Sequence, residues 1–86
     1  MAQVVIYTTD YCSFCARAKA LLRSKGVEFQ EIDLAQDPRL REEVQQRTGR
    51  WTAPQIFIDG VSVGGFDEIK QLDDDGELDR LLGIQP

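Results

Sequence analysis

Two cysteines three positions apart are the residues of this chain best suited to covalent chemistry. Cys12 and Cys15 enclose Ser13 and Phe14, and the 86-residue sequence contains no other cysteine. A helical pattern follows them directly, so Cys12 is expected at a helix start, where unpaired N–H groups and partial positive charge favour thiolate over thiol. Cys15 then lies one helical turn further along. This spacing is close enough for a disulfide between the two sulfurs, and it points to thiol chemistry.

Two kinds of chemistry fit such a pair, zinc binding and redox exchange. A structural zinc site needs four nitrogen or sulfur ligands, and the sequence has no histidine and no third cysteine. Zinc would therefore require two chains sharing their cysteine pairs, and the redox interpretation is favoured in a strand–helix–strand context. Cys12, nearer solvent, is then the nucleophile. Cys15 lies on the helix face of Ala18 and Leu22 and is expected to be the resolving thiol, with the higher pKa.

The stretches around the pair predict the elements that position it. Residues 4–7 form a continuous, β-branched apolar run, typical of a strand buried on both faces. Residues 12–25 have helical periodicity and end at Gly26 after a basic residue. Residues 27–33 alternate apolar and polar side chains, which predicts a half-buried strand. Together these segments predict a right-handed strand–helix–strand unit.

The second half of the chain contains clear start and turn residues. Asp37 and Pro38 predict a helix N-cap and first turn, and Asp59-Gly60 predicts a tight hairpin turn. The expected elements are a helix at 38–48, strands at 55–58 and 61–63, a helix from 66 to 72, a break at 73–76 and a final amphipathic turn at 78–82. The order predicts a single α/β domain over residues 1–86, with a thioredoxin-like, four-stranded mixed sheet flanked by helices on both faces.

Charge and hydropathy narrow the class of protein. The hydrophobic fraction of 42% and charged fraction of 29% are ordinary for a soluble globular chain. Residues 1–50 carry eight basic and seven acidic side chains, whereas residues 51–86 carry two and eight, a net charge of −6. Without a basic stripe, a long apolar run or a signal peptide, we expect no nucleic-acid partner, no membrane and a cytoplasmic location. The acidic half is expected to be a solvated surface.

The segment Thr52-Ala53-Pro54 precedes the third predicted strand. Proline commonly opens an edge strand, which is one interpretation of this segment. The other interpretation is a cis bond between Ala53 and Pro54, which would leave the Ala53 backbone groups free to pair with an extended peptide. The sequence alone does not decide between them, since X–Pro bonds are cis in only about 5–6% of cases.

Gly64-Gly65-Phe66-Asp67 ends the last strand and begins a helix. A glycine pair also lets a ligand approach the backbone closely. The helix N-terminus offers N–H groups to a carboxylate, and Asp67 offers an acceptor to an ammonium group. Donors and an acceptor at one place suit the end group of an α-amino acid.

Four stretches of the chain match one family pattern in order and spacing. They are Ile6-Tyr7-Thr8, Cys12-Ser13-Phe14-Cys15 with Ala18-Lys19 and Leu21-Leu22, Thr52-Ala53-Pro54-Gln55-Ile56-Phe57-Ile58, and Gly64-Gly65-Phe66-Asp67. Together they resemble the glutaredoxins, specifically the small bacterial dithiol type. The resemblance implies a thioredoxin fold with a cis Pro54. It also implies glutathione-dependent reduction of protein disulfides and glutathione mixed disulfides, with glutathione regenerating the enzyme.

The resemblance also implies where glutathione binds. Its cysteinyl backbone is expected to pair with Ala53, and its γ-glutamyl end with Phe66 and Asp67. The glycine carboxylate is expected toward Arg41, near Phe14 and Trp51. The whole expected set is Phe14, Arg41, Thr52, Ala53, Pro54, Gly65, Phe66 and Asp67, on a monomer that acts on disulfide-bonded or glutathionylated proteins.

The chain departs from the family pattern at three positions. Thr9 stands where a lysine is usual, which removes a cation near Cys12, and Phe66 stands where a third cysteine is usual. Ser13 replaces the usual proline, so its hydroxyl is available to donate to the Cys12 thiolate.

These departures leave two alternative functions open. The replacement of proline is compatible with a dimer that binds a [2Fe-2S] cluster through one Cys12 per chain and two glutathiones. The dithiol enzyme itself is expected to bind no metal. The second alternative is a redoxin that is reduced by thioredoxin reductase. Thr9 in place of lysine argues mildly for it, whereas the glutathione-site pattern around Ala53 and Asp67 argues against it.

Overall fold

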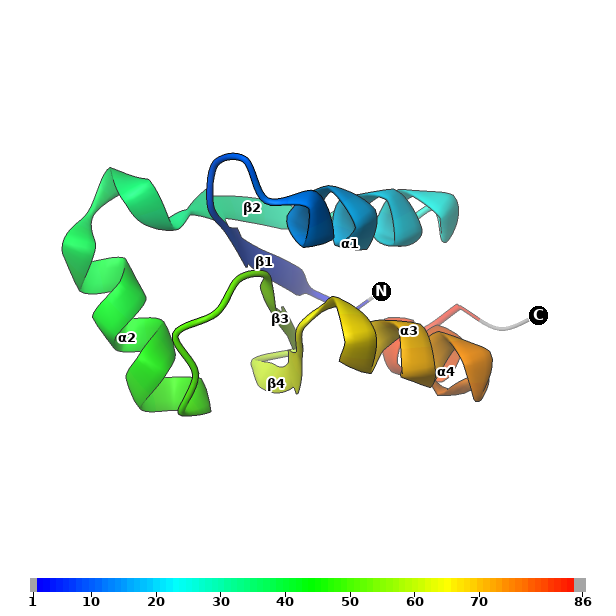
Figure 1. Ribbon diagram of the computed structural model, residues 1–86. Coiled ribbons are helices and arrows are strands. Elements are labelled where there is room, and N and C mark those ends of the chain that lie inside the picture. The colour runs from blue at the N-terminus through cyan, green and yellow to red at the C-terminus, as the bar shows by residue number, and fades with distance from the viewer. Residues whose placement is uncertain (1, 85–86) are drawn as a thin grey trace.

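A mixed four-stranded sheet forms the centre of the molecule, which the computed structural model describes over residues 2–84 (Figure 1). The strands are β1 (Val4–Thr8), β2 (Gln30–Asp33), β3 (Gln55–Ile58) and β4 (Val61–Gly64), in the order β2-β1-β3-β4. β1 pairs with β2 in parallel, whereas the β1–β3 and β3–β4 pairs are antiparallel. The predicted α/β fold with a mixed, thioredoxin-like sheet is confirmed.

The helices pack on both faces of this sheet. They are α1 (Ser13–Ser24), α2 (Pro38–Thr48), α3 (Phe66–Asp74) and α4 (Glu77–Leu82), and a short 3-10 turn, η1 (Leu34–Gln36), leads into α2. In Figure 1, α1 lies at the top, α3 and α4 lie together below it, and α2 stands apart on the other side of the strands. The start of α1 meets the end of β1 and the segment before β3 at one end of the two central strands.

Alternation along the strands produces two hydrophobic clusters. Side chains of β1 and β3 that point one way pack under α1, α3 and α4, and those that point the other way meet α2. The larger cluster contains Val4, Ile6, Ala18, Leu22, Val27, Ile56, Ile58, Ile69, Leu78 and Leu82. The smaller one contains Tyr7, Leu34, Val44 and Phe57. Each β1 residue thus serves one face, so the strand is buried on both sides as its continuous apolar run predicts.

Two boundaries differ from the sequence prediction around the cysteine pair. The α1 helix begins at Ser13, because Cys12 has extended dihedrals (φ −105°, ψ 107°) and caps the helix with its own sulfur. The β2 strand begins only at Gln30, although the alternation starts at Val27. Val27 is buried and Phe29 packs against the larger cluster, but pairing with β1 starts where Gln30 meets Val5. The early alternation therefore reports burial and not strand pairing.

The local start and turn signals of the second half are confirmed. Asp37 caps α2, its Oδ1 accepting the Arg39 N–H at 2.9 Å, and Asp59 and Gly60 both have positive φ in the β3–β4 turn. The predicted break at 73–76 is shorter in the structure, since α3 continues to Asp74. Lys25, at the end of α1, pairs with Asp73 at 2.5 Å and with Asp79 at 2.8 Å. These ion pairs hold the ends of α1, α3 and α4 together.

Candidate functional site

Cys12 lies at the junction of the β1–α1 loop and α1. Its Sγ accepts the backbone N–H of Cys15 at 3.2 Å and lies 3.6 Å from the carbonyl oxygen of Ala53, to which the thiol donates. The first contact is local, three residues along the same helix start. The second joins Cys12 to the segment before β3. One sulfur atom is therefore held between a helix N-terminus and the loop that precedes β3.

Hydrogen bonds around Cys12 stabilise its thiolate. Partial burial works against the charged form, but the Cys15 thiol and N–H, the Thr9 hydroxyl and the Phe14 N–H together outweigh it and lower the pKa of Cys12. Thr9 therefore contributes a donor, although the sequence analysis treated it only as a missing lysine. Among residues 2–84, no hydrogen bond joins the Ser13 hydroxyl to Cys12, so the donation expected from Ser13 is not seen.

Cys15 has the opposite environment one helical turn away. Its side chain is 2% exposed. Burial, followed by the hydrogen bond that its thiol gives to Cys12, raises the pKa of Cys15 to about 11, and Lys19 opposes this rise only weakly. Of the two sulfurs, Cys12 is the more accessible and the more acidic. The structure thus separates the two thiols in the sense that the sequence predicts, with Cys12 suited to attack.

A polar network lies beside the two thiols. Lys19 pairs with Glu31 of β2 at 3.0 Å, and the Thr8 hydroxyl donates to the same carboxylate at 2.9 Å. Together with both cysteines these residues line a polar groove that also includes Thr9. The Lys19 and Thr8 hydrogen bonds lower the pKa of Glu31, against its partial burial. A cation and an anion are therefore fixed next to Cys15, and the sequence analysis did not predict this pair.

On the other side of Cys12, residues from three segments line one pocket of about 290 Å³, called the substrate pocket below. The residues around Pro54, at the end of β4 and at the start of α3 form the wall of this pocket. Within this wall the Ala53–Pro54 peptide bond is cis, as the resemblance implied. The pocket contains every expected glutathione residue except Arg41. Its lining residues are Phe14, Arg50, Thr52, Ala53, Pro54, Gln55, Gly65, Phe66, Asp67 and Glu68.

The glycine pair at the end of β4 allows this wall to close. A Cβ on Gly65 would lie 3.0 Å from the carbonyl oxygen of Pro54, so the two segments approach as closely as backbone allows. Gly64 has φ +95°, and a Cβ there would meet the Glu68 side chain at 2.7 Å. Side chains at these two positions would push β4 and the start of α3 away from Pro54.

The first turn of α3 presents hydrogen-bond donors to the pocket. The leading N–H groups of a helix have no partner within it, and Gly65 has no side chain to cap them. The Glu68 carboxylate accepts the Gly65 N–H at 2.7 Å and pairs with Arg50 at 2.6 Å. The N–H groups of Phe66 and Asp67 belong to residues that line the pocket. An anion bound there would be favoured by the helix dipole as well.

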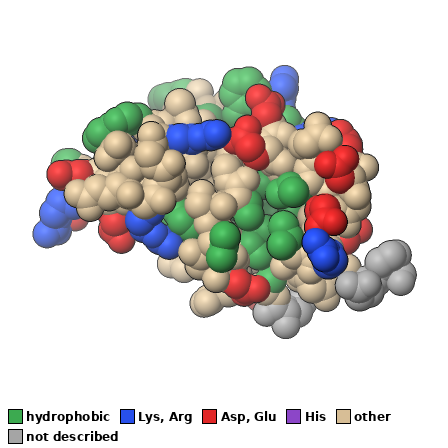
Figure 2. Space-filling model, turned by 90° about the horizontal axis from the view of Figure 1, so that it is seen from below, with side chains coloured by type: hydrophobic (Ala, Val, Ile, Leu, Met, Phe, Trp, Pro, Cys, Tyr) green, Lys and Arg blue, Asp and Glu red, His purple; other side chains and the backbone are tan. Residues whose placement is uncertain are grey.

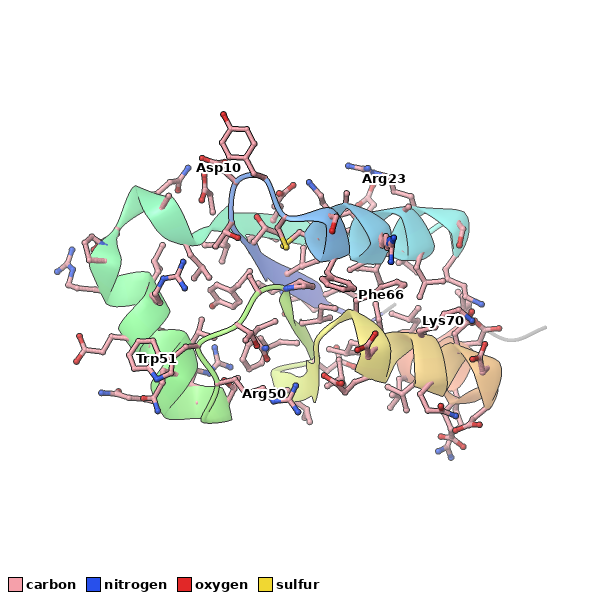
Figure 3. All side chains as sticks on the ribbon, in the orientation of Figure 1. Asp10, Arg23, Arg50, Trp51, Phe66 and Lys70 are labelled. Carbon is pink, nitrogen blue, oxygen red and sulfur yellow. The ribbon has the colours of Figure 1, made fainter. Side chains whose placement is uncertain are left out.

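Arg50 and Glu68 are site residues that sequence reasoning missed. They lie 18 positions apart, and nothing in their spacing indicates that they meet. Figure 3 shows Arg50 and Trp51 on the segment between α2 and β3, and Phe66 at the start of α3, toward α1. The rings of Phe66 and Phe14 are 6.3 Å apart between centroids. Two aromatic rings therefore join the N-terminal turns of α1 and α3 above the pocket.

Arg41 is the expected glutathione residue that the structure does not bring into the pocket. Its guanidinium donates to the Trp51 carbonyl at 3.1 Å. Trp51 is itself half exposed and precedes Thr52, the first pocket residue of that segment. The Arg41 side chain thus holds the loop that leads into the pocket wall.

Residues 2–84 offer neither a cluster of metal ligands nor a membrane-spanning helix. They contain no group of three or more histidine, cysteine, aspartate or glutamate side chains arranged to hold a metal ion. None of their helices has both the length and the apolar character needed to cross a membrane.

Comparison with known proteins gives consistent matches over almost the whole chain. The family model described as Glutaredoxin matches residues 4–63. Glutaredoxin 3 of Escherichia coli (strain K12) is 54% identical over 82 residues, which cover 95% of this chain and 99% of that protein. The solution structure of a glutaredoxin from Brucella melitensis is 57% identical, with a TM-score of 0.86 over 95% of this chain and 89% of the other. A buckwheat glutaredoxin–glutathione complex is 32% identical, with a TM-score of 0.90 over 95% and 77%.

Proposed function

The chain belongs to the glutaredoxin family and is a glutathione-dependent thiol–disulfide oxidoreductase, and we propose that Cys12 is its nucleophile and Cys15 its resolving thiol. The observation that carries this proposal is the contrast between the two sulfurs. Cys12 borders the substrate pocket through Ala53 and has a lowered pKa, whereas Cys15 is buried with a raised one. The thiolate that attacks is therefore the one that a substrate can reach.

The reaction proceeds by two exchanges. The Cys12 thiolate attacks one sulfur of a substrate disulfide; a Cys12–substrate bond forms, the substrate S–S bond breaks, and the second substrate sulfur leaves as a thiolate that takes up a proton. With a glutathione mixed disulfide, glutathione remains on Cys12, and a second glutathione thiolate displaces it as glutathione disulfide. With a protein disulfide, Cys15 attacks the Cys12 sulfur and releases the reduced substrate. Two glutathiones then reduce the Cys12–Cys15 bond.

Cys15 has to lose its proton before it attacks. In the resting state its thiol donates to Cys12, and this bond raises its pKa in addition to burial. Once the Cys12 sulfur is in a disulfide it carries no charge, so that hydrogen bond weakens and the Cys15 pKa falls. Lys19, next to Cys15 and anchored on Glu31, further favours the thiolate at that moment.

Glutathione is proposed to occupy the substrate pocket. A buckwheat relative was solved as a complex with glutathione, and the corresponding fold here supplies an extended backbone at Ala53 and helix N–H groups at Phe66 and Asp67. The Ala53 backbone pairs with the cysteinyl backbone of glutathione. The helix N–H groups bind its γ-glutamyl carboxylate, while the Asp67 side chain accepts from its ammonium group. Arg50 also lines the pocket, where its charge is paired with Glu68. One nitrogen of the Arg41 guanidinium donates to the Trp51 carbonyl, and its remaining N–H groups are proposed to meet the glycine carboxylate.

The setting of this activity is part of the proposal. We place the enzyme in the cytoplasm as a monomer, acting on disulfide-bonded and glutathionylated proteins, because glutathione keeps thiols reduced in that compartment. Size-exclusion chromatography of the reduced protein with light scattering tests the monomer. A dimer that persists without glutathione or iron would contradict it.

The discriminating experiment is a coupled assay with a small glutathione mixed disulfide. We expect turnover with glutathione, glutathione reductase and NADPH, and none with thioredoxin reductase and NADPH. The thiols of the reduced protein are titrated as a control that both cysteines are intact. Turnover with thioredoxin reductase alone would replace the glutathione-dependent function by that of a redoxin reduced by the other enzyme.

A glutathione-ligated [2Fe-2S] dimer is the second candidate function. Cys12 is the single accessible thiol among residues 2–84, so one chain fits one of four thiolate ligands. Two chains and two glutathiones would complete the set, and the cluster would supply electron storage or cluster delivery. Ser13 leaves the first turn of α1 without the rigidity of proline. Anaerobic reconstitution with iron, sulfide and glutathione tests it: a coloured dimer supports cluster binding, and a colourless monomer contradicts it.

A further inference from the structure

An apolar groove lies on the far side of the first turn of α3 from the substrate pocket. It has a volume of about 680 Å³ and is formed by β4, α3 and α4. The apolar side chains that line it are Val61, Val63, Leu72 and Leu81, and the polar ones are Asp67, Glu68 and Gln71. Figure 2 shows hydrophobic side chains gathered in the middle of one face, with acidic side chains around them.

Exposed apolar side chains of β4 and α4 contribute to the groove. β4 is an edge strand, and Val61 and Val63 point to the same face, where α3 and α4 pack. Val63 packs against the larger hydrophobic cluster, whereas Val61 is 64% exposed and Leu81 of α4 is 37% exposed. The apolar face of the sheet therefore continues from the core to the surface at this edge.

The region around the groove carries more acidic than basic side chains. Residues 61–82 carry seven acidic and two basic side chains, a net charge of −5. Five of the seven acidic side chains lie in ion pairs: Asp74 with Lys70, Glu77 with Arg80, Glu68 with Arg50, and Asp73 and Asp79 with Lys25. With Arg50 and Lys25 counted, the net charge of the region is −3, and Asp67 and Asp75 have no ion-pair partner among residues 2–84. The rim thus attracts a cationic partner. It repels nucleic acid, anionic lipid and a second copy of this chain, which would present the same acidic face.

The groove and the substrate pocket share a wall. Asp67 and Glu68, in the first turn of α3, line both of them. A substrate chain that extended from the pocket across this turn would enter the groove. Glutathione is small and is proposed to occupy the substrate pocket without reaching the groove. A protein segment bound through its disulfide has further residues, and these can contact the groove.

We propose that this groove docks a segment of the protein substrate that combines basic and apolar residues, several positions from the disulfide that Cys12 attacks. The inference rests on the proposed function, since it assigns a specificity surface to the protein-disulfide reaction. Apolar side chains of the segment bury Val61 and Leu81, and its lysines or arginines meet the acidic rim. Small mixed disulfides do not reach the groove, so it selects among protein substrates and leaves the chemistry unchanged.

Two synthetic peptides test this surface. Both carry the same intramolecular disulfide and the same flexible spacer, followed by Lys-Val-Lys-Leu in one and Glu-Val-Glu-Leu in the other. We expect kcat/KM to be about tenfold higher for the basic peptide at low salt, a difference that shrinks as salt is added. Equal values for the two peptides would overturn the proposal. Failure of the protein to reduce a small glutathione mixed disulfide would instead refute the proposed function itself.

Matched variants test whether the preference for the basic peptide comes from the groove. Gln71→Lys places a cation in the groove, and Gln46→Lys makes the same change of charge on an exposed part of α2. Gln71→Lys should lower kcat/KM for the basic peptide about fivefold. Gln46→Lys should leave this value within twofold. Neither variant should alter the rate with the small mixed disulfide. The double variant Val61→Ser and Leu81→Ser should remove most of the advantage of the basic peptide. Equal losses from the two lysine variants, or losses that extend to the small substrate, would contradict docking in the groove.

Discussion

The first turn of α1 and the wall that faces it across Cys12 are built in different ways. The α1 turn is local: Cys12 caps the helix and receives the N–H of a residue three positions on. The facing wall combines the cis Ala53–Pro54 segment, the end of β4 and the start of α3, which are remote in sequence. Under the proposed function, the turn supplies reactivity and the wall supplies recognition.

Reactivity and recognition should therefore respond differently to mutation. The reactivity of Cys12 depends on short-range hydrogen bonds, so changes in the α1 turn and its loop should alter rates and pH profiles. Recognition depends on how closely separate segments approach, so changes in the wall should alter KM for glutathione. Substitutions in each of the two parts should therefore separate changes in rate from changes in binding.

Removal of the two sulfurs should have very different consequences. Cys12→Ser should reduce the glutathione-dependent rate with a small mixed disulfide to the uncatalysed rate, because no other thiol can reach the substrate. Cys15→Ser should keep most of that activity but lose reduction of protein disulfides, which need a resolving thiol. Coupled assays with both kinds of substrate measure this. An active Cys12→Ser variant beside an inactive Cys15→Ser variant would reverse the roles.

Gly65→Ala tests the wall. Its Cβ would lie 3.0 Å from the Pro54 carbonyl, so the start of α3 has to move away from the cis-proline segment. We expect KM for glutathione to rise about tenfold, with a loss of about 1 kcal/mol in the free energy of unfolding. Gly49→Ala is the control, because its positive φ costs similar stability while its Cβ meets no atom within 4 Å. An equal rise in KM for both variants would show that general destabilisation is responsible.

Thr9→Val tests the loop before α1. Its hydroxyl is one of the donors that lower the pKa of Cys12 against the opposing effect of burial, so its removal should raise that pKa. Because the thiolate reacts, the rate of alkylation by iodoacetamide should fall about threefold at neutral pH and recover fully at high pH. The pH profile should shift upward without a change in plateau. Ser13→Ala removes a hydroxyl that makes no bond to Cys12 within residues 2–84, and it should leave the profile in place.

Glu68→Gln should have the smallest effect, a small loss in the free energy of unfolding. The pH dependence of this loss shows whether the charge of Glu68 is its cause. The Gly65 N–H, followed by Arg50, lowers the pKa of Glu68 against its partial burial. The ionised carboxylate therefore stabilises the fold above the ordinary glutamate pKa of 4.5, and this contribution is lost as pH falls through the lower folded value. The side chain is 41% exposed, so we expect a loss of only about 0.5–1 kcal/mol at neutral pH.

Urea unfolding of Glu68→Gln at neutral and acidic pH makes this measurement. The difference from the unmodified chain should shrink toward zero at the acidic end. Glu43→Gln, an exposed carboxylate on α2, should show almost no difference at either pH. A loss for Glu68→Gln that stays constant with pH would mean that its charge is not the cause.

The sequence alone predicted what short-range geometry decides. Helix caps and tight turns involve residues a few positions apart, so Asp37 and Asp59-Gly60 indicated α2 and the β3–β4 turn before any packing was known. The order of apolar runs then indicated the sheet, since each strand must bury its face. The spacing of Cys12 and Cys15 likewise predicted one accessible and one buried thiol, because a helical turn carries the second toward the core.

The tertiary structure decided which partners the long and polar side chains contact. Arg50 meets Glu68 across 18 positions, whereas Arg41 holds the Trp51 carbonyl instead of the pocket. Thr9 takes part in the Cys12 hydrogen bonds, and residues of β4, α3 and α4 come together to line the apolar groove. Such contacts depend on the distance between segments in space. A flexible side chain has several partners within reach of its sequence position, and only the packed fold selects one of them.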